Sequence, residues 1–247
     1  MNKLDTIAVI PARDGSKTVT NKNLRRINGH SLIEWAVEVC KQTKIIDEIY
    51  LSSDSDRILN HLSDNKVVCL KRPAELASDD SLIHKTVNHA IKQIMNCSGR
   101  KDFILTLIEP TCPFRIPQDI DECVSKIIYD NFDSAATFTQ TESSIDRIWK
   151  LEDGRLDPLL ETNSPWNRRQ DNIPSYKLSG GCYALRARKF LKLNTPDLLF
   201  GRRTHVLMPT IRSVDIDTKF DLMIANMLAE KYELHPPLMG NEIPSLI

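Results

Sequence analysis

The stretch "TIAVIPARDGSKTVTNKN", residues 6 to 23, contains a predicted strand and the loop that follows it. Its first seven residues are mostly apolar, which predicts a buried strand. The strand runs into a turn that holds one glycine, three cations and two asparagines. Beyond the turn, residues 31–43 ("SLIEWAVEVCKQT") have apolar residues at helical spacing. The polar turn therefore lies at the carboxyl end of a strand, where open α/β sheets bind their ligands.

Strands and helices alternate from residue 6 to residue 140. Each predicted strand is a short apolar run, and each predicted helix has apolar residues three or four positions apart. This alternation predicts a doubly wound α/β fold, in which helices cover both faces of a mostly parallel sheet. After the first unit, the expected strands are 46–54, 66–73, 102–111 and 134–140, and the expected helices are 54–64, 80–95 and 117–130.

The second half of the chain alternates less regularly. Residues 147–160 ("RIWKLEDGRLDPLL") predict a hairpin that turns at Asp153 and Gly154. A strand is expected at 176–187 and a closing helix at 218–232. At 247 residues the chain is expected to form one large domain with a small additional lobe.

Composition and charge exclude several classes of protein. The 33 Lys and Arg residues equal the 33 Asp and Glu residues, so no overall positive field attracts nucleic acid or an anionic membrane. The longest apolar runs are too short to span a bilayer, and the N-terminus lacks the apolar stretch of a signal peptide. The six cysteines show neither CxxC nor Cys/His metal spacing. We therefore expect a cytoplasmic protein without disulfides or zinc.

The loop after the first strand combines cations with backbone N–H groups. It lacks the GxGxxG pattern of dinucleotide-binding folds and the GxxxxGK[ST] pattern of P-loop NTPases. Arg13, Lys17 and Lys22, together with N–H groups freed around Gly15, would neutralise a polyphosphate. The alternative is an ordinary solvated loop with incidental lysines, and the loop alone leaves both interpretations open.

A pair of carboxylates near the end of the chain bears on this choice. In "RSVDIDT" (212–218), Asp215 and Asp217 are two residues apart in an extended segment, so both side chains project from one face. Such a pair suits Mg²⁺, which prefers oxygen ligands and keeps waters and substrate phosphates in its other positions. Alternatively, the pair caps the helix that begins near Thr218.

Seven stretches in order along the chain carry a family resemblance: "IAVIPARDGSK", "KNLRRINGHSLI", "IYLSSD", "KRPAELASDDS", "EPTCPFRIPQDID", "RRQDNIPSYKLSGGCYAL" and "RSVDIDTKFDL". Together they resemble the acylneuraminate cytidylyltransferases, the CMP-sialic acid synthetases, and more distantly the synthetase that activates Kdo. The resemblance implies a homodimeric enzyme that transfers CMP from CTP to the anomeric hydroxyl of a nine-carbon 2-keto-3-deoxy (nonulosonic) sugar acid and releases pyrophosphate. It implies a single cytidylyltransferase domain over 1–247, of the nucleotide-diphospho-sugar transferase type, with a small dimerisation and sugar-site lobe around 145–210.

The resemblance also implies roles for individual residues. The catalytic residues would be Arg13, Lys22, Asp215 and Asp217, of which the two aspartates would bind Mg²⁺ or Mn²⁺. The nucleotide would contact Ala12, Arg13, Gly15, Ser16, Lys17, Lys22, Asn23, Arg72 and Ser81. The sugar acid would contact Glu109, Arg147, Arg169, Ser179 and Tyr183, since an arginine fork matches a carboxylate. As alternatives, Arg72 is an ordinary surface residue at a strand end and Tyr183 is a core tyrosine.

Several positions depart from the family pattern. Asp14 places an anion beside the expected phosphate site, and Ser179 stands where an asparagine is usual. Leu82 and Ile83 follow Ser81 in a stretch that is commonly richer in serine. These departures put part of the nucleotide and sugar contacts in question.

Glu109 is the departure with a direct chemical consequence. The family usually has a glutamine there, which both donates and accepts hydrogen bonds, whereas an ionised glutamate only accepts. Either a cation such as Arg147 or Lys177 pairs with Glu109, or the acceptor offers hydroxyl or amino donors. We therefore expect an acceptor other than N-acetylneuraminic acid.

Two other functions remain open at this point. One is a nucleotide-binding module that has lost catalysis, against which the intact Asp215 and Asp217 pair argues. The other is a related nucleotidyltransferase with a different nucleotide or a non-acid sugar, against which Arg147 and Arg169 argue.

Overall fold

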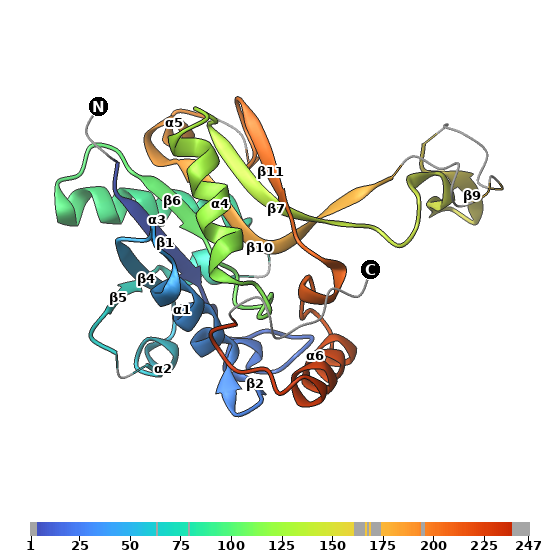
Figure 1. Ribbon diagram of the computed structural model, residues 1–247, viewed down its shortest axis with the longest axis horizontal. Coiled ribbons are helices and arrows are strands. Elements are labelled where there is room, and N and C mark those ends of the chain that lie inside the picture. The colour runs from blue at the N-terminus through green and yellow to red at the C-terminus, as the bar shows by residue number, and fades with distance from the viewer. Residues whose placement is uncertain are drawn as a thin grey trace.

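The central feature of the fold is a seven-stranded sheet with the strand order β11-β7-β10-β6-β1-β4-β5 (Figure 1). The computed structural model describes residues 4–62, 64–78, 80–160, 166, 168, 174–193 and 196–238. Strands β5, β4, β1 and β6 are mutually parallel, and β11 is parallel to β7. Strand β10 runs antiparallel between β6 and β7. The predicted doubly wound, mostly parallel α/β sheet is confirmed.

Most element positions agree with the sequence patterns. The sheet strands are β1 (Thr6–Pro11), β4 (Glu48–Ser53), β5 (Val67–Lys71), β6 (Ile104–Leu107), β7 (Ser134–Gln140), β10 (Tyr176–Arg186) and β11 (Arg203–Leu207). The helices are α1 (Leu32–Gln42), α2 (Asp56–Leu59), α3 (Ile83–Ser98), α4 (Pro117–Ile128), α5 (Ala187–Leu191) and α6 (Lys219–Lys231). Two short hairpins are formed by β2 (Arg26–Ile27) with β3 (His30–Ser31) and by β8 (Trp149–Glu152) with β9 (Arg155–Pro158).

Two predicted helices have different bounds in the structure. Helix α2 ends at Leu59 rather than at residue 64, and its N-cap Ser55 makes no side-chain capping bond. Helix α3 begins at Ile83 rather than at residue 80, because residues 74–77 form a short 3₁₀ helix and the Ser81 N–H closes a turn onto the Ser78 carbonyl. Ser81 therefore stays in a loop that faces the candidate site.

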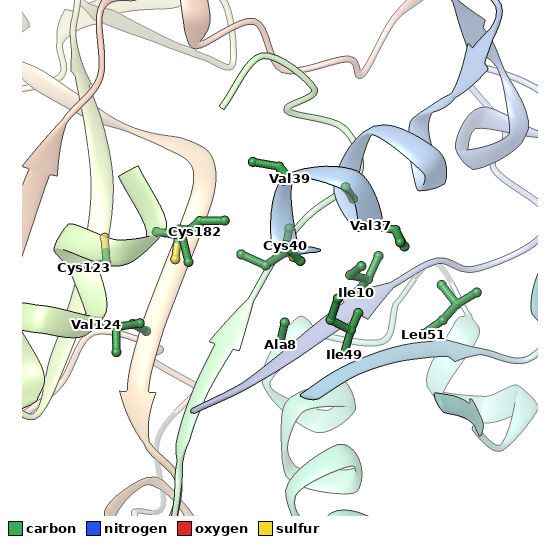
Figure 2. Close-up of a cluster of buried hydrophobic side chains, with 14 of the residues drawn as sticks. Ala8, Ile10, Val37, Val39, Cys40, Ile49, Leu51, Cys123, Val124 and Cys182 are labelled. Carbon is green, nitrogen blue, oxygen red and sulfur yellow. The ribbon is translucent and has the colours of Figure 1, made fainter. Parts of the chain in front are cut away.

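Alternate residues of β1 belong to two separate hydrophobic cores, one on each face of the sheet. Ala8 and Ile10 pack with residues of α1 and α4 on one face of the sheet, as part of Figure 2 shows. Ile7 and Val9 pack with α3 and α5 on the other face. This is the two-residue period of a strand covered on both sides, which explains why β1 is apolar throughout.

The chain reverses its direction of winding next to β1. From β1 it moves outward to β4 and β5, and then returns through α3 to β6 on the other side of β1. The loops that leave the carboxyl ends of β1 and β6 therefore diverge and open a crevice between them. Ligands of open α/β sheets bind at such a switch point.

The β8–β9 hairpin projects away from the body of the molecule (Figure 1). It is a two-stranded sheet of its own, and its turn is at Asp153 and Gly154 as predicted, both with positive φ. The additional lobe was expected over residues 145–210, but within that span β10 and β11 are strands of the central sheet. The part that stands apart is thus smaller than the sequence suggested, because β10 inserts between β6 and β7.

Candidate active site

A cleft of about 220 Å³ lies at the switch point between β1 and β6. Pro11 and Arg13 line it from the end of β1, and Glu109, Pro110 and Thr111 line it from the end of β6. The other side is lined by residues of the 72–86 segment and by two residues of the opening loop, namely Arg72, Leu76, Ser78, Ser81, Ile83, Thr86, Lys22 and Asn23. Six residues that the sequence assigned to the nucleotide or sugar are therefore brought together here: Arg13, Lys22, Asn23, Arg72, Ser81 and Glu109.

The opening loop is folded so that two of its three cations, Arg13 and Lys22, line the cleft. The buried Asn23 donates from Nδ2 to the Arg13 carbonyl oxygen (3.0 Å) and so closes the loop. The Arg13 side chain donates from Nη1 to the Ala77 carbonyl oxygen (3.1 Å) on the opposite wall. Lys22 approaches from the short 3₁₀ helix Lys22–Leu24. The loop is thus more than a solvated turn with incidental lysines.

Asp14 is directed away from these cations. Its carboxylate accepts hydrogen bonds from the Ser55 hydroxyl (3.0 Å) and from Arg57 Nη2 (2.8 Å) at the start of α2. Partial burial alone would raise the pKa of Asp14, but these bonds and the Gly15 N–H outweigh it, and the pKa is lowered. Asp14 therefore pins the loop to α2 instead of placing an anion at the expected phosphate site.

Arg72 and Ser81 present buried polar groups to the cleft. Arg72 is only 4% exposed, which rules out the surface alternative. One terminal nitrogen lies 3.7 Å from Asp54 Oδ1, while its Nε and the Ser81 hydroxyl are buried with no hydrogen-bond partner among the described residues. Burial lowers the pKa of Arg72, although Asp54 opposes this. Unpartnered buried polar atoms beside a cleft are groups that a ligand would satisfy.

Asp215 and Asp217 line neither cleft themselves, but they lie next to two lining residues of the first cleft, Lys22 and Glu109. Ile216 between them is fully buried, and its N–H donates to the Thr111 carbonyl oxygen (2.9 Å). Lys22 Nζ lies 2.8 Å from Asp217 Oδ1. The N-cap of α6 is Thr218, which forms a capping box with Asp221. The aspartate side chains are thus not needed as helix caps, and their grouping favours a role at the cleft.

The Asp215 carboxylate is open to solvent on one side and surrounded by protein on the others. This partial desolvation raises its pKa, and the nearby Asp217 adds to the effect, while a hydrogen bond from Thr111 and the charges of Lys22 and Arg115 oppose it. A carboxylate that is costly to ionise and has a second carboxylate beside it would be stabilised by a cation.

Glu109 connects the first cleft to a second one of about 440 Å³. Glu109 and Ile83 line both. Desolvation, with the charge of Asp215 next, raises the pKa of Glu109 to about 7. The cations that oppose this shift are Arg115 and Lys22, so the expected partners Arg147 and Lys177 are not the ones that act on it. The second cleft is further lined by Leu178, Tyr183, Pro196, Asp197, Leu198, Leu199 and Arg203.

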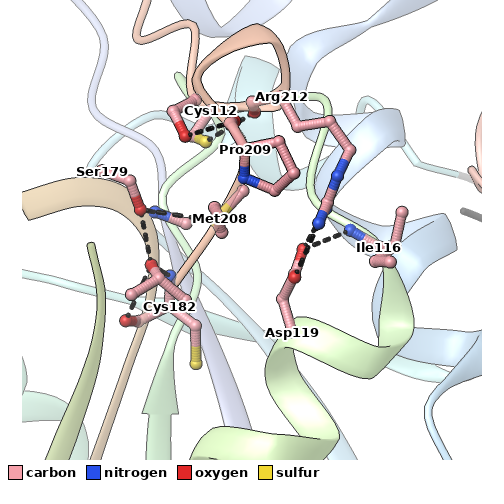
Figure 3. Close-up of polar contacts among 11 residues, drawn as sticks. Cys112, Ile116, Asp119, Ser179, Cys182, Met208, Pro209 and Arg212 are labelled. Carbon is pink, nitrogen blue, oxygen red and sulfur yellow. Dashed lines mark hydrogen bonds and ion pairs between the residues drawn. The ribbon is translucent and has the colours of Figure 1, made fainter. Parts of the chain in front are cut away.

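Tyr183 faces the second cleft from the middle of β10, so it is more than a core tyrosine. Burial raises the pKa of its hydroxyl, and Glu109 adds to the shift. Four residues earlier, Ser179 points into the interior, where its hydroxyl donates to Thr137 Oγ1 (2.7 Å) and lies 3.3 Å from the Met208 sulfur (Figure 3). The expected sugar contact of the Ser179 side chain is therefore not present, because the β10–β7 register shifts between residues 178 and 183 and turns Ser179 inward.

Gly180 fits where a side chain would not. It has φ of +73°, and a Cβ atom there would lie 3.3 Å from Glu109 Oε2 and 3.6 Å from Asp215 Oδ2. The same register shift thus allows the backbone of β10 to approach both carboxylates.

The remaining sequence-assigned residues do not line either cleft. Ala12 is buried and pairs through its N–H with the Ser52 carbonyl oxygen (2.9 Å). Gly15, Ser16 and Lys17 belong to the loop but are not among the lining residues. Arg147 is exposed in a 3₁₀ helix (Ile145–Arg147) just before the projecting hairpin. Arg169 lies outside the described residues.

Sequence reasoning missed several residues of the two clefts. Arg203, at the start of β11, lines the second cleft, but β11 itself was not predicted. Leu198 and Leu199 lie in a segment without a clear periodic pattern. Arg115 was visible in "EPTCPFRIPQDID", yet nothing in that string showed that its side chain folds back under Glu109.

Comparison with known proteins identifies the family. The family model described as "Cytidylyltransferase" matches residues 7–195. The chain belongs to the cytidylyltransferase family. As a member, this cytidylyltransferase is a CTP-dependent nucleotidyltransferase, and the resemblance inferred from the seven stretches is confirmed at the level of the family.

Three relatives illustrate the similarity of this cytidylyltransferase to curated proteins. It is 30% identical to the CMP-N,N'-diacetyllegionaminic acid synthase of Legionella pneumophila, over 91% of this chain and 96% of that one. It is 26% identical to a pseudaminic acid cytidylyltransferase of Campylobacter jejuni, over 91% and 96%. It is 25% identical to the N-acylneuraminate cytidylyltransferase of Escherichia coli over 91% of this chain, but spans only 52% of that longer protein.

Solved structures share the fold of this cytidylyltransferase. CMP:2-keto-3-deoxy-manno-octonic acid synthetase, solved with CTP, aligns over 93% of this chain and all of that one with a TM-score of 0.64 and 17% identity. Francisella tularensis 2-C-methyl-D-erythritol 4-phosphate cytidylyltransferase aligns over 91% and 99% with a TM-score of 0.64 and 15% identity. Within the described residues, no helix has the length and apolar character needed to cross a bilayer.

Proposed function

We propose that this cytidylyltransferase transfers CMP from CTP to the anomeric hydroxyl of a nonulosonic acid and releases pyrophosphate. The observation that carries the proposal is the pair of clefts joined at Glu109 and Ile83. One cleft presents three cations, suited to a triphosphate, and the other presents a mixed apolar and polar wall, suited to a sugar. The names of the relatives, which act on sialic, legionaminic and pseudaminic acids, agree with this division.

In this reaction the acceptor oxygen attacks the α-phosphorus in line while pyrophosphate leaves. Arg13 and Lys22 hold and neutralise the phosphates, because charge on the triphosphate must be screened before an oxygen nucleophile approaches. Arg72 and Ser81, which line this cleft and carry buried polar atoms without a partner among the described residues, provide donors for the nucleoside end of CTP. Glu109 and Tyr183 orient the sugar acid between the two clefts.

A divalent cation fits the Asp215 and Asp217 pair. The proposal is supported by the raised pKa of Asp215 beside a second carboxylate, because a cation would stabilise both ionised groups. No group of three or more His, Cys, Asp or Glu side chains suited to a metal occurs among the described residues. Mg²⁺ requires only one or two carboxylates when phosphates and waters complete its shell. When bound, Mg²⁺ or Mn²⁺ would lower the negative charge of the triphosphate.

The acceptor cleft favours a nonulosonic acid other than N-acetylneuraminic acid. With its pKa raised to about 7, Glu109 is partly ionised near neutral pH, and the ionised form requires hydrogen-bond donors from the acceptor. The facing wall contains Leu178, Leu198 and Leu199, which suit deoxy or acyl groups better than bare hydroxyls. A second acylamino substituent, beyond the one that N-acetylneuraminic acid carries, would supply a further N–H donor and apolar methyl group, as in the N,N'-diacetyl acid that one relative is named for. Glu109→Gln should shift the ranking of kcat/KM toward N-acetylneuraminic acid, and an unchanged ranking would overturn this part of the proposal.

A homodimer is the proposed assembly, with one domain per protomer. The projecting segment exposes large apolar side chains that the body of the protomer does not cover: Ile148, Trp149, Leu151, Leu156, Leu159, Leu160 and Trp166. Exposed apolar patches of this size mark protein interfaces. A partner subunit would also bring Arg147 near a sugar cleft that it does not line within one protomer. The proposed location is the cytoplasm, where CTP would be available as the substrate.

Pyrophosphate release tests the proposed function directly. Purified protein with Mg²⁺ should release pyrophosphate with CTP, and not with ATP, GTP or UTP, when a nonulosonic acid is present. Asp215→Ala and Asp217→Ala should abolish most turnover without loss of fold, and a chelator should have the same effect. If no acid of the panel led to pyrophosphate release, the alternative of a nucleotide-binding module without catalysis would stand instead.

Matched charge removals test the opening loop. Arg13→Ala and Lys22→Ala should each weaken CTP use by about 1.5 to 3 kcal/mol, the value of one charge-assisted hydrogen bond. Lys44→Ala removes the same charge from an exposed position outside the cleft and should leave CTP kinetics unchanged. If all three variants had equal kinetics with CTP, the loop cations would not bind CTP, and the loop would be an ordinary solvated surface.

A further inference from the structure

Arg115 is a fully buried arginine behind the acceptor side of the cleft. Only 1% of its surface is exposed. Its Nη2 donates to the backbone carbonyl oxygen of Glu109, while Nε and Nη1 are buried without a hydrogen-bond partner among the described residues. The described residues also form no ion pair with it. A guanidinium buried without an ion pair is costly, so folding alone does not account for a charge at this position.

The charge of Arg115 acts on groups at the cleft. Its Nη2 bonds the Glu109 backbone, which places the guanidinium directly behind the end of β6, and burial keeps this charge away from water. The other charged groups that face Glu109 are Asp217 and Lys22. Lys22 also acts on the carboxylates of Glu109 and Asp215, but its ammonium is paired with Asp217, whereas Arg115 has no carboxylate partner among the described residues.

The loop that Arg115 holds also supports the aspartate pair. Glu109 begins this loop, which continues to Arg115 before α4. Thr111, in its middle, hydrogen-bonds to Asp215 through its side chain and accepts from the Ile216 N–H (2.9 Å) through its carbonyl oxygen. One buried side chain thus fixes the loop that carries Glu109 and holds Asp215 in place.

We propose that Arg115 is a positioning residue for the acceptor: it holds the Glu109 backbone and supplies a fixed positive charge behind the Glu109 and Asp215 carboxylates. The inference rests on the proposed function, because it explains how an acidic acceptor is admitted beside two carboxylates. Without this charge, a sugar acid entering next to Glu109 meets stronger repulsion, because Lys22 and the proposed divalent cation also serve the aspartate pair and the phosphates. CTP lies on the side served by Arg13, Lys22 and Arg72, and depends less on Arg115.

The test combines neutral and charged replacements with a matched control. Arg115→Met removes the charge at similar volume, Arg115→Gln keeps a donor for the Glu109 carbonyl, and Arg115→Lys keeps the charge. Arg186→Met is the control, because Arg186 also donates to backbone carbonyls, those of residues 127 and 132, at the opposite end of the sheet. For each variant, kcat and KM are measured for CTP and for the best acid of the wild-type panel, and the unfolding midpoint in urea is recorded.

We expect Arg115→Met and Arg115→Gln to lower kcat/KM for the acid about tenfold or more, mainly through KM. The KM for CTP should change less than threefold, and Arg115→Lys should recover most of the loss. In a Glu109→Gln background, Arg115→Met should lower kcat/KM for the acid threefold or less, because the negative charge of Glu109 that repels the acid is already removed. Arg186→Met should alter the urea midpoint without altering the acceptor KM.

Three outcomes would overturn the inference. The first is that Arg115→Met and Glu109→Gln lower kcat/KM for the acid additively. The second is that the Arg115 variants lose kcat/KM equally for CTP and for the acid. The third is that both neutral variants fail to fold and Arg115→Lys is no more stable than they are. A wild-type enzyme that uses none of the acids contradicts the proposed function itself. An active wild type with unchanged acceptor kinetics in the Arg115 variants contradicts only the inference about Arg115.

Discussion

Gly180→Ala is the substitution for which the structure gives the sharpest expectation. Gly180 has φ of +73°, and Gly99 at the end of α3 has φ of +69°. Alanine in this left-handed region costs about 1 to 2 kcal/mol, partly offset by a stiffer unfolded chain. We therefore expect each Gly→Ala variant to lose about 1 kcal/mol of unfolding free energy, or about 2 to 4 °C in Tm.

The two variants should differ in activity because their surroundings differ. A Cβ at Gly99 would meet nothing within 4 Å, whereas a Cβ at Gly180 would lie 3.3 Å from Glu109 Oε2 and 3.6 Å from Asp215 Oδ2. The Glu109 carboxylate can yield by a few tenths of an ångström, so stability suffers little beyond the backbone strain. Misplacement of a reacting group by about 1 Å costs on the order of a hundredfold in rate. A displacement of Glu109 by a few tenths of an ångström should therefore lower kcat/KM about tenfold.

The assay is pyrophosphate release at saturating CTP with the acceptor varied, alongside thermal unfolding of both variants. The expected result is equal Tm losses with a drop in kcat/KM for Gly180→Ala only. If Gly180→Ala retained the activity of Gly99→Ala, the reasoning that Glu109 and Asp215 must keep their placement would be refuted. A much larger Tm loss for Gly180→Ala would show that the carboxylates cannot yield.

Three further predictions concern other parts of the chain. Thr218→Ala removes the cap of α6 and should lower the unfolding free energy in urea by about 1 kcal/mol. Asp217→Asn should reduce turnover with little change in stability. A loss of stability for Asp217→Asn without one for Thr218→Ala would mean that Asp217 is the helix cap. Asp14→Asn should lower stability at pH 7 by up to about 1 kcal/mol, since its ion pair with Arg57 is partly exposed. Because the folded-state pKa of Asp14 is lowered, this difference is present above the unfolded pKa of about 3.9 and should shrink as pH falls through the folded value; a constant difference from pH 7 to pH 3 would contradict it. Leu151→Glu, at a side chain that is 73% exposed on the hairpin, should convert a dimer to a monomer in light scattering, and a monomeric wild type would contradict the proposed assembly.

The fold class followed from the sequence because its signals are local. Apolar runs and helical spacing located to within a few residues every strand that the first half contributes to the central sheet, but not the short β2 and β3 strands, and Pro117 marked the first residue of α4. The turn at Asp153 and Gly154 was predictable because few residues other than glycine, asparagine and aspartate adopt positive φ readily. The common direction of Asp215 and Asp217 followed from the two-residue period of an extended chain, with Ile216 buried between them.

Only the tertiary structure showed which sheet neighbours surround the site. The insertion of β10 between β6 and β7 brings Tyr183 and Gly180 beside Glu109, although more than 70 residues separate them. A shift of register in that strand turns Ser179 inward, and a shift of this kind leaves no mark in a single sequence. The burial of Arg72 and of Arg115 could not be read from their neighbours, since arginine is mostly exposed and both stretches are polar. Chain-distant packing fixes the charge balance of the cleft, because electrostatic interactions depend on distance in space and on local burial, whereas a sequence pattern records only the order of residues along the chain.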